Sequence, residues 1–368
     1  MSASSLRIVI ACGGTGGHLF PGIAVAQQLK AMGHRPALLI SRKSVDADGA
    51  RKYGDLEFHT VSAIAKPPLF SLRMLSFIWS FARTLLACRR FIRREKVDVV
   101  VGMGGFTSLA PVLAGRMQGI RTYVHESNAL PGRANRLTAR FCTAVLLGLE
   151  AAAAYLPGHS CRVVGTPVRE EFLHCPPRHE ARAALGLPPD DKPLILVTGG
   201  SQGAQKLNSL LVEAAKATPH VHFLIIAGRA DSARVQALAE GAQNITVLGF
   251  CADMPMAYAA ADGVITRAGA STLTELSIVA RAALLVPFPF AADNHQYINA
   301  RVFADVGAAR LCEQKDLTVA VIQNFITHIV LAPTARSAME SALAALASPH
   351  AAQQIAQVVA APTPAPLS

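Results

Sequence analysis

A glycine-rich turn near the start of the chain is the first place where residue types and spacing suggest chemistry. Residues 13–18 (GGTGGH) follow an apolar run typical of a β-strand and precede a helical pattern. Glycines let backbone N–H groups approach an anion, and a helix N-terminus favours negative charge. The run is neither a dinucleotide fingerprint, since Leu19 stands where its third glycine belongs, nor a Walker A loop, since no Gly-Lys pair follows. It predicts an anion-binding turn, the alternative being a tight turn that binds nothing.

His18 ends this turn and is a candidate general base. A neutral imidazole at the mouth of a ligand site can accept a proton from a substrate hydroxyl. The alternative is a histidine that only caps the helix or donates a hydrogen bond within the turn. Its position favours the site role.

Two more polar turns follow apolar runs in the first half of the chain. Residues 101–106 (VGMGGF) contain Gly104 and Gly105, and this second glycine turn should lie beside the one that contains Gly14. Two adjacent glycine loops suit a pyrophosphate. Residues 125–128 (HESN) end on Asn128, whose amide can both donate to and accept from sugar hydroxyls. Each turn alone could be ordinary loop chemistry.

The second half repeats the pattern. Residues 199–204 (GGSQGA) present Ser201 at a helix start, and residues 266–275 (TRAGASTLTE) form a small-residue turn followed by a helix. Glu275 can accept hydrogen bonds from both hydroxyls of a ribose, or it can simply complement the helix dipole. Gln296 follows another apolar run and lies in residues 295–299 (HQYIN).

Strand-like runs separated by helix-length segments must position these turns. One series runs from 6–12 to 161–165 and a second from 193–200 to 282–288, with a Pro-rich, charged link at 169–193. This alternation predicts an α/β protein with two doubly wound parallel sheets, residues 1–168 and 169–345, that face each other across a cleft. A short helix at 351–360 is expected to pack back on the first domain, and residues 361–368 to form a frayed tail.

Composition limits the class of protein. The chain has 368 residues, 51% of them hydrophobic, which predicts two domains and excludes a disordered chain. The longest candidates for a membrane span, 99–115 and 317–335, lack charged residues but are interrupted by proline and by glycine or polar residues. No spanning helix and no signal peptide are therefore expected, and the protein should be cytosolic. Seven cysteines without a C-x-x-C pair argue against a disulfide framework and a zinc site. The net charge of +11 predicts an anionic partner, namely nucleic acid, a phosphorylated small molecule or acidic lipid.

Residues 66–96 combine an apolar surface with a basic flank. An apolar face beside basic residues is typical of a helix that lies on an anionic bilayer surface. The alternative is a core helix with a solvated end. The basic stretch contains a single aromatic residue, Phe91, and lacks the repeated interleaving of a nucleic-acid platform, which argues against nucleic acid. The predicted membrane patch consists of Phe77, Ile78, Trp79, Phe81, Arg83, Arg89, Arg90, Arg93 and Arg94.

Taken in order, these motifs resemble the MurG family of bacterial transferases, which add N-acetylglucosamine to a lipid-linked muramyl-pentapeptide. The resemblance extends over GGTGGHLFPGIAVA, GMGGF, HESN, GTPVR, GGSQGA, RAGASTLTE and NHQYINA. It implies the GT-B fold, UDP-N-acetylglucosamine as donor substrate, inversion at the anomeric carbon, and no metal or other cofactor. It also implies a polyprenyl-pyrophosphoryl muramyl-peptide acceptor, no nucleic acid, and a peripheral position on the cytoplasmic face of the plasma (inner) membrane. The rivals are a GT-B transferase with another lipid or a small aglycone as acceptor, and a nucleotide-binding or RNA-binding protein without turnover.

The resemblance also assigns residues. His18 is the first choice for deprotonating the acceptor hydroxyl and Glu126 the second. Gly14, Gly104 and Gly105 would contact the acceptor pyrophosphate. Cys251 stands where the family often has isoleucine, and Thr166 and Phe106 stand where asparagine and tyrosine are usual, which puts any hydrogen bond from the last two in doubt. Donor contacts are implied for Thr15, Gly16, Gly17, Asn128, Arg169, Ser201, Cys251, Ala270, Ser271, Thr272, Leu273, Thr274, Glu275 and Gln296.

Overall fold

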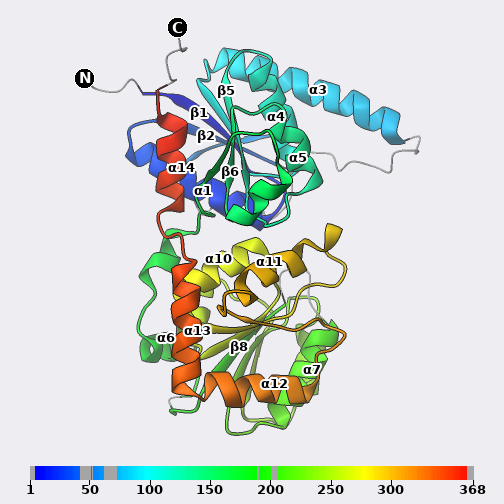
Figure 1. Ribbon diagram of the computed structural model, residues 1–368, viewed down its shortest axis with the longest axis vertical. Coiled ribbons are helices and arrows are strands. Elements are labelled where there is room, and N and C mark those ends of the chain that lie inside the picture. The colour runs from blue at the N-terminus through cyan, green and yellow to red at the C-terminus, as the bar shows by residue number, and fades with distance from the viewer. Residues whose placement is uncertain are drawn as a thin grey trace. The chain divides into compact units, whose positions relative to one another are not determined.

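The protein consists of two α/β units (Figure 1). The computed structural model describes residues 5–41, 51, 53–61, 73–188, 190–199 and 205–362. Unit 1 comprises Met1–Arg169 and Ser348–Ser368, and unit 2 comprises Glu170–Ala347. Each unit is built on one parallel sheet, which confirms the predicted fold class, two doubly wound domains of the GT-B type. Arg169 belongs to unit 1, whereas the prediction begins the second domain at this residue.

Unit 1 contains a seven-stranded parallel sheet in the order β3-β2-β1-β4-β5-β6-β7. The strand order reverses between β1 and β4, and the carboxyl ends at such a switch point are where open α/β sheets bind ligands. Its strands are β1 (Arg7–Ala11), β2 (Arg35–Ile40), β3 (Glu57–Thr60), β4 (Val99–Gly102), β5 (Arg121–Glu126), β6 (Ala144–Leu147) and β7 (Cys161–Val163). Its helices are α1 (Gly16–Ala31), α3 (Arg73–Arg94), α4 (Phe106–Arg116), α5 (Arg133–Ala139), the 3-10 helix η1 (Glu150–Tyr155) and α14 (Ala351–Ala360).

Strand β1 separates two hydrophobic layers. Ile8 and Ile10 pack into one buried cluster together with residues of α1, while Val9 and Ala11 pack into another that contains Ile92 of α3. All four strand residues are fully buried. Because successive side chains of a strand point to opposite faces, helices must cover both faces of this sheet.

The C-terminal helix belongs to unit 1. α14 forms at the residues predicted to be helical and lies alongside α1 (Figure 1). Its Ile355 and Val359 are fully buried in the same cluster as Ile8. The tail predicted to be frayed, 361–368, lies outside the described residues from position 363 on.

Unit 2 contains a six-stranded parallel sheet in the order β10-β9-β8-β11-β12-β13. Here the order reverses between β8 and β11. The strands are β8 (Leu194–Thr198), β9 (His222–Ile226), β10 (Ile245–Leu248), β11 (Gly263–Thr266), β12 (Ala282–Leu285) and β13 (Arg310–Leu311). The helical segments are η2 (Glu170–His174), α6 (Arg178–Ala184), α7 (Gln205–Lys216), α8 (Ser232–Leu238), α9 (Met254–Ala260), α10 (Ala270–Val279), η3 (Ala292–Asn294), α11 (His295–Ala304), α12 (Val319–Phe325), the π-helical η4 (Ile326–Val330) and α13 (Pro333–Ala345).

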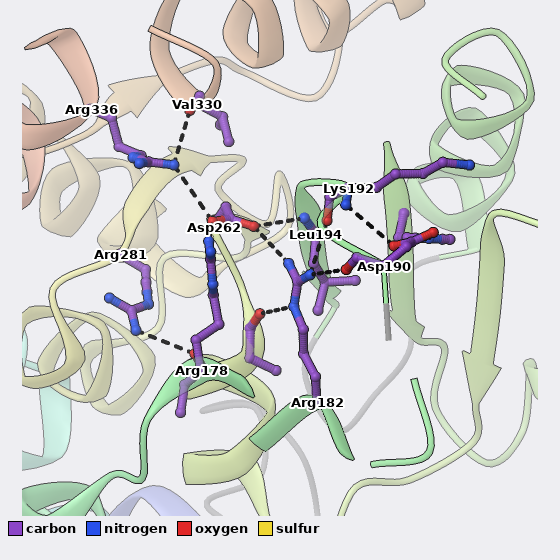
Figure 2. A network of polar contacts seen from close by, with 12 residues as sticks. Arg178, Arg182, Asp190, Lys192, Leu194, Asp262, Arg281, Val330 and Arg336 are labelled. Carbon is purple, nitrogen blue, oxygen red and sulfur yellow. Dashed lines mark hydrogen bonds and ion pairs between the residues drawn. The ribbon is translucent and has the colours of Figure 1, made fainter. Parts of the chain in front are cut away.

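One buried carboxylate ties α6 to the sheet of unit 2 (Figure 2). Asp262 accepts hydrogen bonds from Arg182 Nη2 at 2.8 Å and from the Leu194 backbone N–H at 2.9 Å, and it also pairs with Arg178 and Arg336. Arg182 donates further to the backbone oxygens of residues 190, 192 and 260. The segment 169–193 is predicted as an inter-domain link, but from residue 170 its described part is an ordered portion of unit 2, because arginines of α6 neutralise a buried charge.

Candidate active site

The two glycine turns of unit 1 lie side by side at the β1–β4 switch point, as the sequence predicts. β1 and β4 are neighbours, with Ala11 opposite Gly102, so the turns that follow them share one edge of the sheet. Gly14 has φ of +113° and Gly104 of +108°, a left-handed conformation that favours glycine. Thr107 Oγ1 donates to the Gly13 carbonyl at 2.7 Å and links the two turns. Thr107 is not among the residues predicted above, although a hydroxyl in the first turn of a helix after a glycine loop is a recognisable signal.

His18 joins this cluster from the first turn of α1. Its Nδ1 lies 3.2 Å from Thr15 Oγ1. The ring is so close to the second glycine turn that a Cβ on Gly104 would lie 3.1 Å from His18 Nε2, and one on Gly105 would lie 3.1 Å from Cε1. Glycine at both positions therefore makes room for the imidazole. The structure brings together His18, Thr15, Gly104 and Gly105, which the sequence places almost ninety residues apart.

Glu126 is enclosed by hydrogen-bond donors. At the end of β5, Oε1 accepts from the backbone N–H and the side-chain Nδ2 of Asn128, both at 2.8 Å. Oε2 accepts from the Gly132 N–H at 2.9 Å and from Asn135 Nδ2 at 2.8 Å. Each oxygen thus has two donors, and Glu126 is only 2% exposed. This geometry suits an organiser of the loop that holds Asn128, while the suggested role of Glu126 as a base stays a prediction.

His125 is a structural histidine. It is buried, with Nε2 at 2.9 Å from the Gly165 carbonyl oxygen and Nδ1 at 3.3 Å from Ser127 Oγ. Burial, opposed by the hydrogen bond to the Gly165 carbonyl and reinforced by the nearby His18, lowers the pKa of His125 to about 4, so the ring stays neutral at physiological pH. A neutral ring in this position serves to hold β5 against the segment after β7.

Arg169, predicted to meet the donor diphosphate, lies against α1. Its guanidinium carbon is 4.9 Å from the centre of the Phe20 ring, two residues after His18 in the chain. Thr166 is buried, and its Oγ1 would lie 2.2 Å from a Cβ on Gly148, so a glycine is needed opposite it. Phe106 begins α4 directly after the second glycine turn.

In unit 2 the predicted donor residues gather at the carboxyl ends of β11 and β12. Gln296 Oε1 accepts from the Ala268 N–H at 3.2 Å and from the Phe288 N–H at 3.0 Å, which joins the turn after β11 to the loop after β12. These two bonds orient the Gln296 amide. Residues 270–275 form the first turns of α10, in which Leu273 is buried and Ala270, Ser271, Thr272, Thr274 and Glu275 are partly exposed. Ser201 lies outside the described residues.

Arg267 stabilises the turn after β11 through hydrogen bonds to the loop after β12. It is 6% exposed and donates to the Val286 and Pro287 carbonyl oxygens at 3.1 and 3.2 Å and to Gln314 Oε1 at 2.6 Å. Burial lowers its pKa to about 10, which still leaves the guanidinium charged at neutral pH. Arg267 therefore positions the two loops that Gln296 joins.

Phe250, which is not among the predicted residues, lies beside Cys251 just beyond β10. Its side chain is 60% exposed, and the Arg229 guanidinium lies 4.6 Å from the centre of its ring. Cys251 is buried, and its Sγ donates to the Asp253 carbonyl oxygen. An exposed aromatic at the carboxyl edge of a sheet is a surface on which a planar base can stack.

Helix α3 contains the predicted membrane patch, and the structure divides that patch. Phe81 packs against the core cluster that contains Cys88 and Ile92, whereas Ile78 and Trp79 are 56% and 63% exposed. The N-terminal half of α3 extends beyond the body of unit 1 (Figure 1). One face of the helix is therefore part of the core, as the second alternative predicts, while contact of the exposed face with a bilayer stays a prediction. Within the described ranges no helix is long and apolar enough to span a bilayer, and no cluster of three or more His, Cys, Asp or Glu residues could hold a metal ion.

Comparison with known proteins connects both units to one family. The glycosyltransferase family 28 N-terminal domain model matches residues 8–147, and the C-terminal domain model of the same family matches residues 194–355. Two relatives, from Gloeothece citriformis and Myxococcus xanthus, are 34% and 33% identical over 98% and 96% of this chain and 97% and 92% of their own. Both are named UDP-N-acetylglucosamine–N-acetylmuramyl-(pentapeptide) pyrophosphoryl-undecaprenol N-acetylglucosamine transferase. The crystal structure of Acinetobacter baumannii MurG matches with a TM-score of 0.75 and 30% identity, over 96% of this chain and 99% of that one.

Proposed function

The chain belongs to glycosyltransferase family 28, and from this premise we propose that it transfers N-acetylglucosamine from UDP-N-acetylglucosamine to N-acetylmuramyl-(pentapeptide) pyrophosphoryl-undecaprenol. This is the step that converts lipid I to lipid II in peptidoglycan synthesis. The observation that carries the proposal is the match of both family domains, in order, together with relatives of this name over nearly the whole chain.

Unit 1 is assigned to the acceptor. The backbone N–H groups of the turns around Gly14 and Gly104 are suited to the acceptor pyrophosphate, because glycine turns at a switch point expose such donors. His18 is assigned the role of the base that removes the proton from the attacking sugar hydroxyl. When Nδ1–H donates to Thr15 Oγ1, Nε2 carries the lone pair that can accept that proton.

Unit 2 is assigned to the donor. Phe250 offers its ring face to uracil and Cys251 its main chain, while Glu275 accepts from the ribose hydroxyls. Gln296, with its amide oriented by two backbone donors, binds hydroxyls of the sugar. Arg169 and Ser201 are assigned to the diphosphate, where positive charge and hydrogen bonds stabilise the leaving UDP.

The bond changes balance without a cofactor. The acceptor oxygen forms a bond to the anomeric carbon as the bond from that carbon to the UDP oxygen breaks, and the configuration inverts. The proton of the acceptor hydroxyl goes to His18, and the electron pair leaves with UDP. The predicted independence from metal ions and the predicted cleft between the domains belong to this proposal.

We place the enzyme on the cytoplasmic face of the plasma membrane as a peripheral protein. The exposed Ile78 and Trp79 on α3, next to a series of arginines, support contact with an anionic bilayer. Vesicle binding is therefore expected to fall as the salt concentration rises, since salt screens exposed charges. Absence of binding to anionic vesicles at low salt would contradict this placement.

The transferase assay uses the full-length protein and UDP-N-acetylglucosamine labelled in the sugar. Four acceptor conditions are compared: the muramyl-peptide pyrophosphoryl lipid, a sterol, a diacylglycerol and no acceptor. Label should enter lipid only with the muramyl-peptide pyrophosphoryl lipid, and UDP should be released only when that lipid is present. Transfer to a sterol or a diacylglycerol but not to the muramyl lipid would favour another family 28 acceptor. Donor binding without UDP release under any condition would favour a nucleotide-binding protein without turnover.

A further inference from the structure

Two consecutive hydroxyl side chains in the first turn of α4 connect the two glycine turns of unit 1 to each other and to β1. Thr107 Oγ1 donates to the Gly13 carbonyl oxygen, in the first glycine turn, at 2.7 Å. Ser108 Oγ donates to the Gly104 carbonyl oxygen at 2.8 Å and also lies 3.1 Å from that of Ala11, the last residue of β1. Thr107 and Ser108 are called the hydroxyl pair below.

Ser108 binds both polar groups of the Gly104 backbone. Besides its bond to the carbonyl oxygen, Ser108 Oγ accepts from the Gly104 N–H at 3.1 Å. Ser108 is fully buried, and a Cβ on Gly102 would lie 2.6 Å from its Cβ, so glycine at position 102 makes room for it. A glycine with φ of +108° has many other conformations open to it, and two bonds to one buried hydroxyl select a single one. Ser108 therefore fixes the second glycine turn.

The His18 ring lies against the turn that Ser108 fixes. The short distances from Nε2 and Cε1 to the Cβ positions of Gly104 and Gly105 show that the imidazole packs directly on this backbone. On its other side, Nδ1 lies 3.2 Å from Thr15 Oγ1, in the first glycine turn. The ring thus contacts both turns, and a change in their separation displaces Nε2.

We propose that Thr107 and Ser108 are positioning residues, which fix the separation of the two glycine turns and thereby align His18 Nε2 with the acceptor hydroxyl. This inference rests on the proposed function, in which His18 removes the proton from that hydroxyl. The hydroxyl pair acts without contacting a substrate, because both protons are directed to backbone carbonyl oxygens of the protein. Accurate placement matters, since a displacement of about 1 Å can reduce a rate about a hundredfold.

The first experiment measures kcat of Thr107 variants of the full-length protein with both substrates saturating. Thr107→Val keeps the shape of the side chain without the hydroxyl and should reduce kcat about tenfold. Thr107→Ser keeps the hydroxyl and should have a kcat close to that of the wild type. The matched control is Thr122→Val near the amino end of β5. Thr122 Oγ1 donates to the Phe141 carbonyl oxygen at 2.8 Å, and its loss should leave kcat unchanged.

A double-mutant cycle tests whether Thr107 acts through His18. If the hydroxyl pair positions the imidazole, Thr107→Val has nothing left to misplace once His18 is alanine, so H18A/T107V should be as slow as H18A alone. An equal loss in both backgrounds would overturn the proposal. A raised KM for the acceptor lipid at unchanged kcat would also overturn it, because the pair would then serve pyrophosphate binding. So would an unchanged kcat of T107V, or losses as large in T107S or T122V.

The second experiment needs no substrate. Ser108→Ala leaves the buried Gly104 N–H without its acceptor, so amide hydrogen exchange of residues 103–105 should rise. The NMR signals of the His18 ring, assigned by their absence in H18A, should shift, while those of the exposed His179 ring should not. Unchanged exchange, or faster exchange with unshifted His18 signals, would overturn the proposal.

The two experiments separate this inference from the proposed function. A wild type that transfers no sugar would count against the proposed function, and the exchange and NMR results would still decide whether the hydroxyl pair places the His18 ring. An active wild type whose His18 signals ignore Ser108→Ala would keep the proposed function and refute the positioning role.

Discussion

Glu126 and Asp262 are both buried carboxylates, only 2% and 5% exposed, but their partners differ. Glu126 accepts from neutral donors, which are backbone N–H groups and asparagine amides of residues 128–135. Asp262 pairs with arginines of α6 and α13, about seventy to eighty residues away along the chain. One carboxylate shapes a local loop, and the other holds distant segments together.

The two carboxylates also lie at opposite edges of their sheets. Glu126 is the last residue of β5, at the carboxyl edge, whereas Asp262 directly precedes β11, at the amino edge. The amino edge of unit 1 carries a similar ionic cluster, since Arg7 at the start of β1 pairs with Glu57 at the start of β3. In both units the amino edge holds ion pairs and the carboxyl edge holds glycine or small-residue turns. We infer that stability and chemistry are separated between the two edges.

The largest expected effect is on turnover at the carboxyl edge. His18→Ala should reduce kcat about 10²–10⁴-fold, because a positioned base contributes that much to proton transfer. The affinity for UDP-N-acetylglucosamine and the melting temperature should change little. Steady-state kinetics, donor titration and thermal unfolding measure the three quantities.

A histidine remote from the site provides the control for His18. His179, with 82% of its side chain exposed, should tolerate replacement by alanine without loss of rate. If His18→Ala retained the wild-type kcat, His18 would have no part in the mechanism.

The next largest effect is on stability at the amino edge. Asp262→Ala leaves Arg182 buried without its anion and should lower the free energy of unfolding of unit 2 by about 3 kcal/mol. Activity per folded molecule at low temperature should be retained, since Asp262 is far from the carboxyl edge of its sheet. Urea unfolding together with a rate measurement on the folded fraction tests both expectations.

The matched control is the exposed pair Arg301–Asp305 on α11, whose side chains are 56% and 59% exposed. Asp305→Ala should change the free energy of unfolding by less than about 0.5 kcal/mol. If Asp262→Ala lowered the free energy of unfolding by as little, the ion pairs at the amino edge would not have the stabilising role assigned to them.

An intermediate effect is expected at Glu126. Glutamine supplies an NH2 group where two donors point, so Glu126→Gln should cost about 2 kcal/mol and raise amide hydrogen exchange across residues 127–135. Turnover should fall because Asn128 loses its fixed orientation, while the pH profile of kcat keeps its shape. A changed pH profile with unchanged hydrogen exchange would instead make Glu126 a base.

The smallest effect is a pH dependence at the amino edge of unit 1. Hydrogen bonds from Arg7 lower the pKa of Glu57 from 4.5 to about 2. Since the folded pKa is below the unfolded one, this contribution to stability is present above about pH 4.5 and is lost as the pH falls toward 2. Glu57→Gln should remove this pH dependence. The free energy of unfolding should change by less than about 1 kcal/mol, because Glu57 is partly exposed. Parallel stability curves for wild type and variant between pH 2 and pH 5 would contradict it.

Much of the carboxyl edge can be predicted from the sequence. The turns around Gly14 and Gly104 follow apolar runs directly, and parallel strands bring their carboxyl ends to one edge. Their adjacency follows once the sheet is doubly wound, because β1 and β4 are then neighbours although β2 and β3 lie between them in the chain. The position of Gln296 after another strand follows in the same way. Thr107 and Phe250 escaped prediction because a threonine or phenylalanine near a strand end has many ordinary uses, and only the distances to Gly13 and Arg229 single them out.

The sequence by itself determined the alternation of strands and helices, the glycine turns and the family, because each depends on residues close together in the chain. The tertiary structure decided what depends on distant residues. It enclosed Glu126 among four donors, made the segment from residue 170 part of unit 2 through Asp262, and gave α3 a core face and an exposed apolar part. Burial, ion pairing and convergence of side chains are set by packing between segments, and a pattern along the chain does not contain that packing.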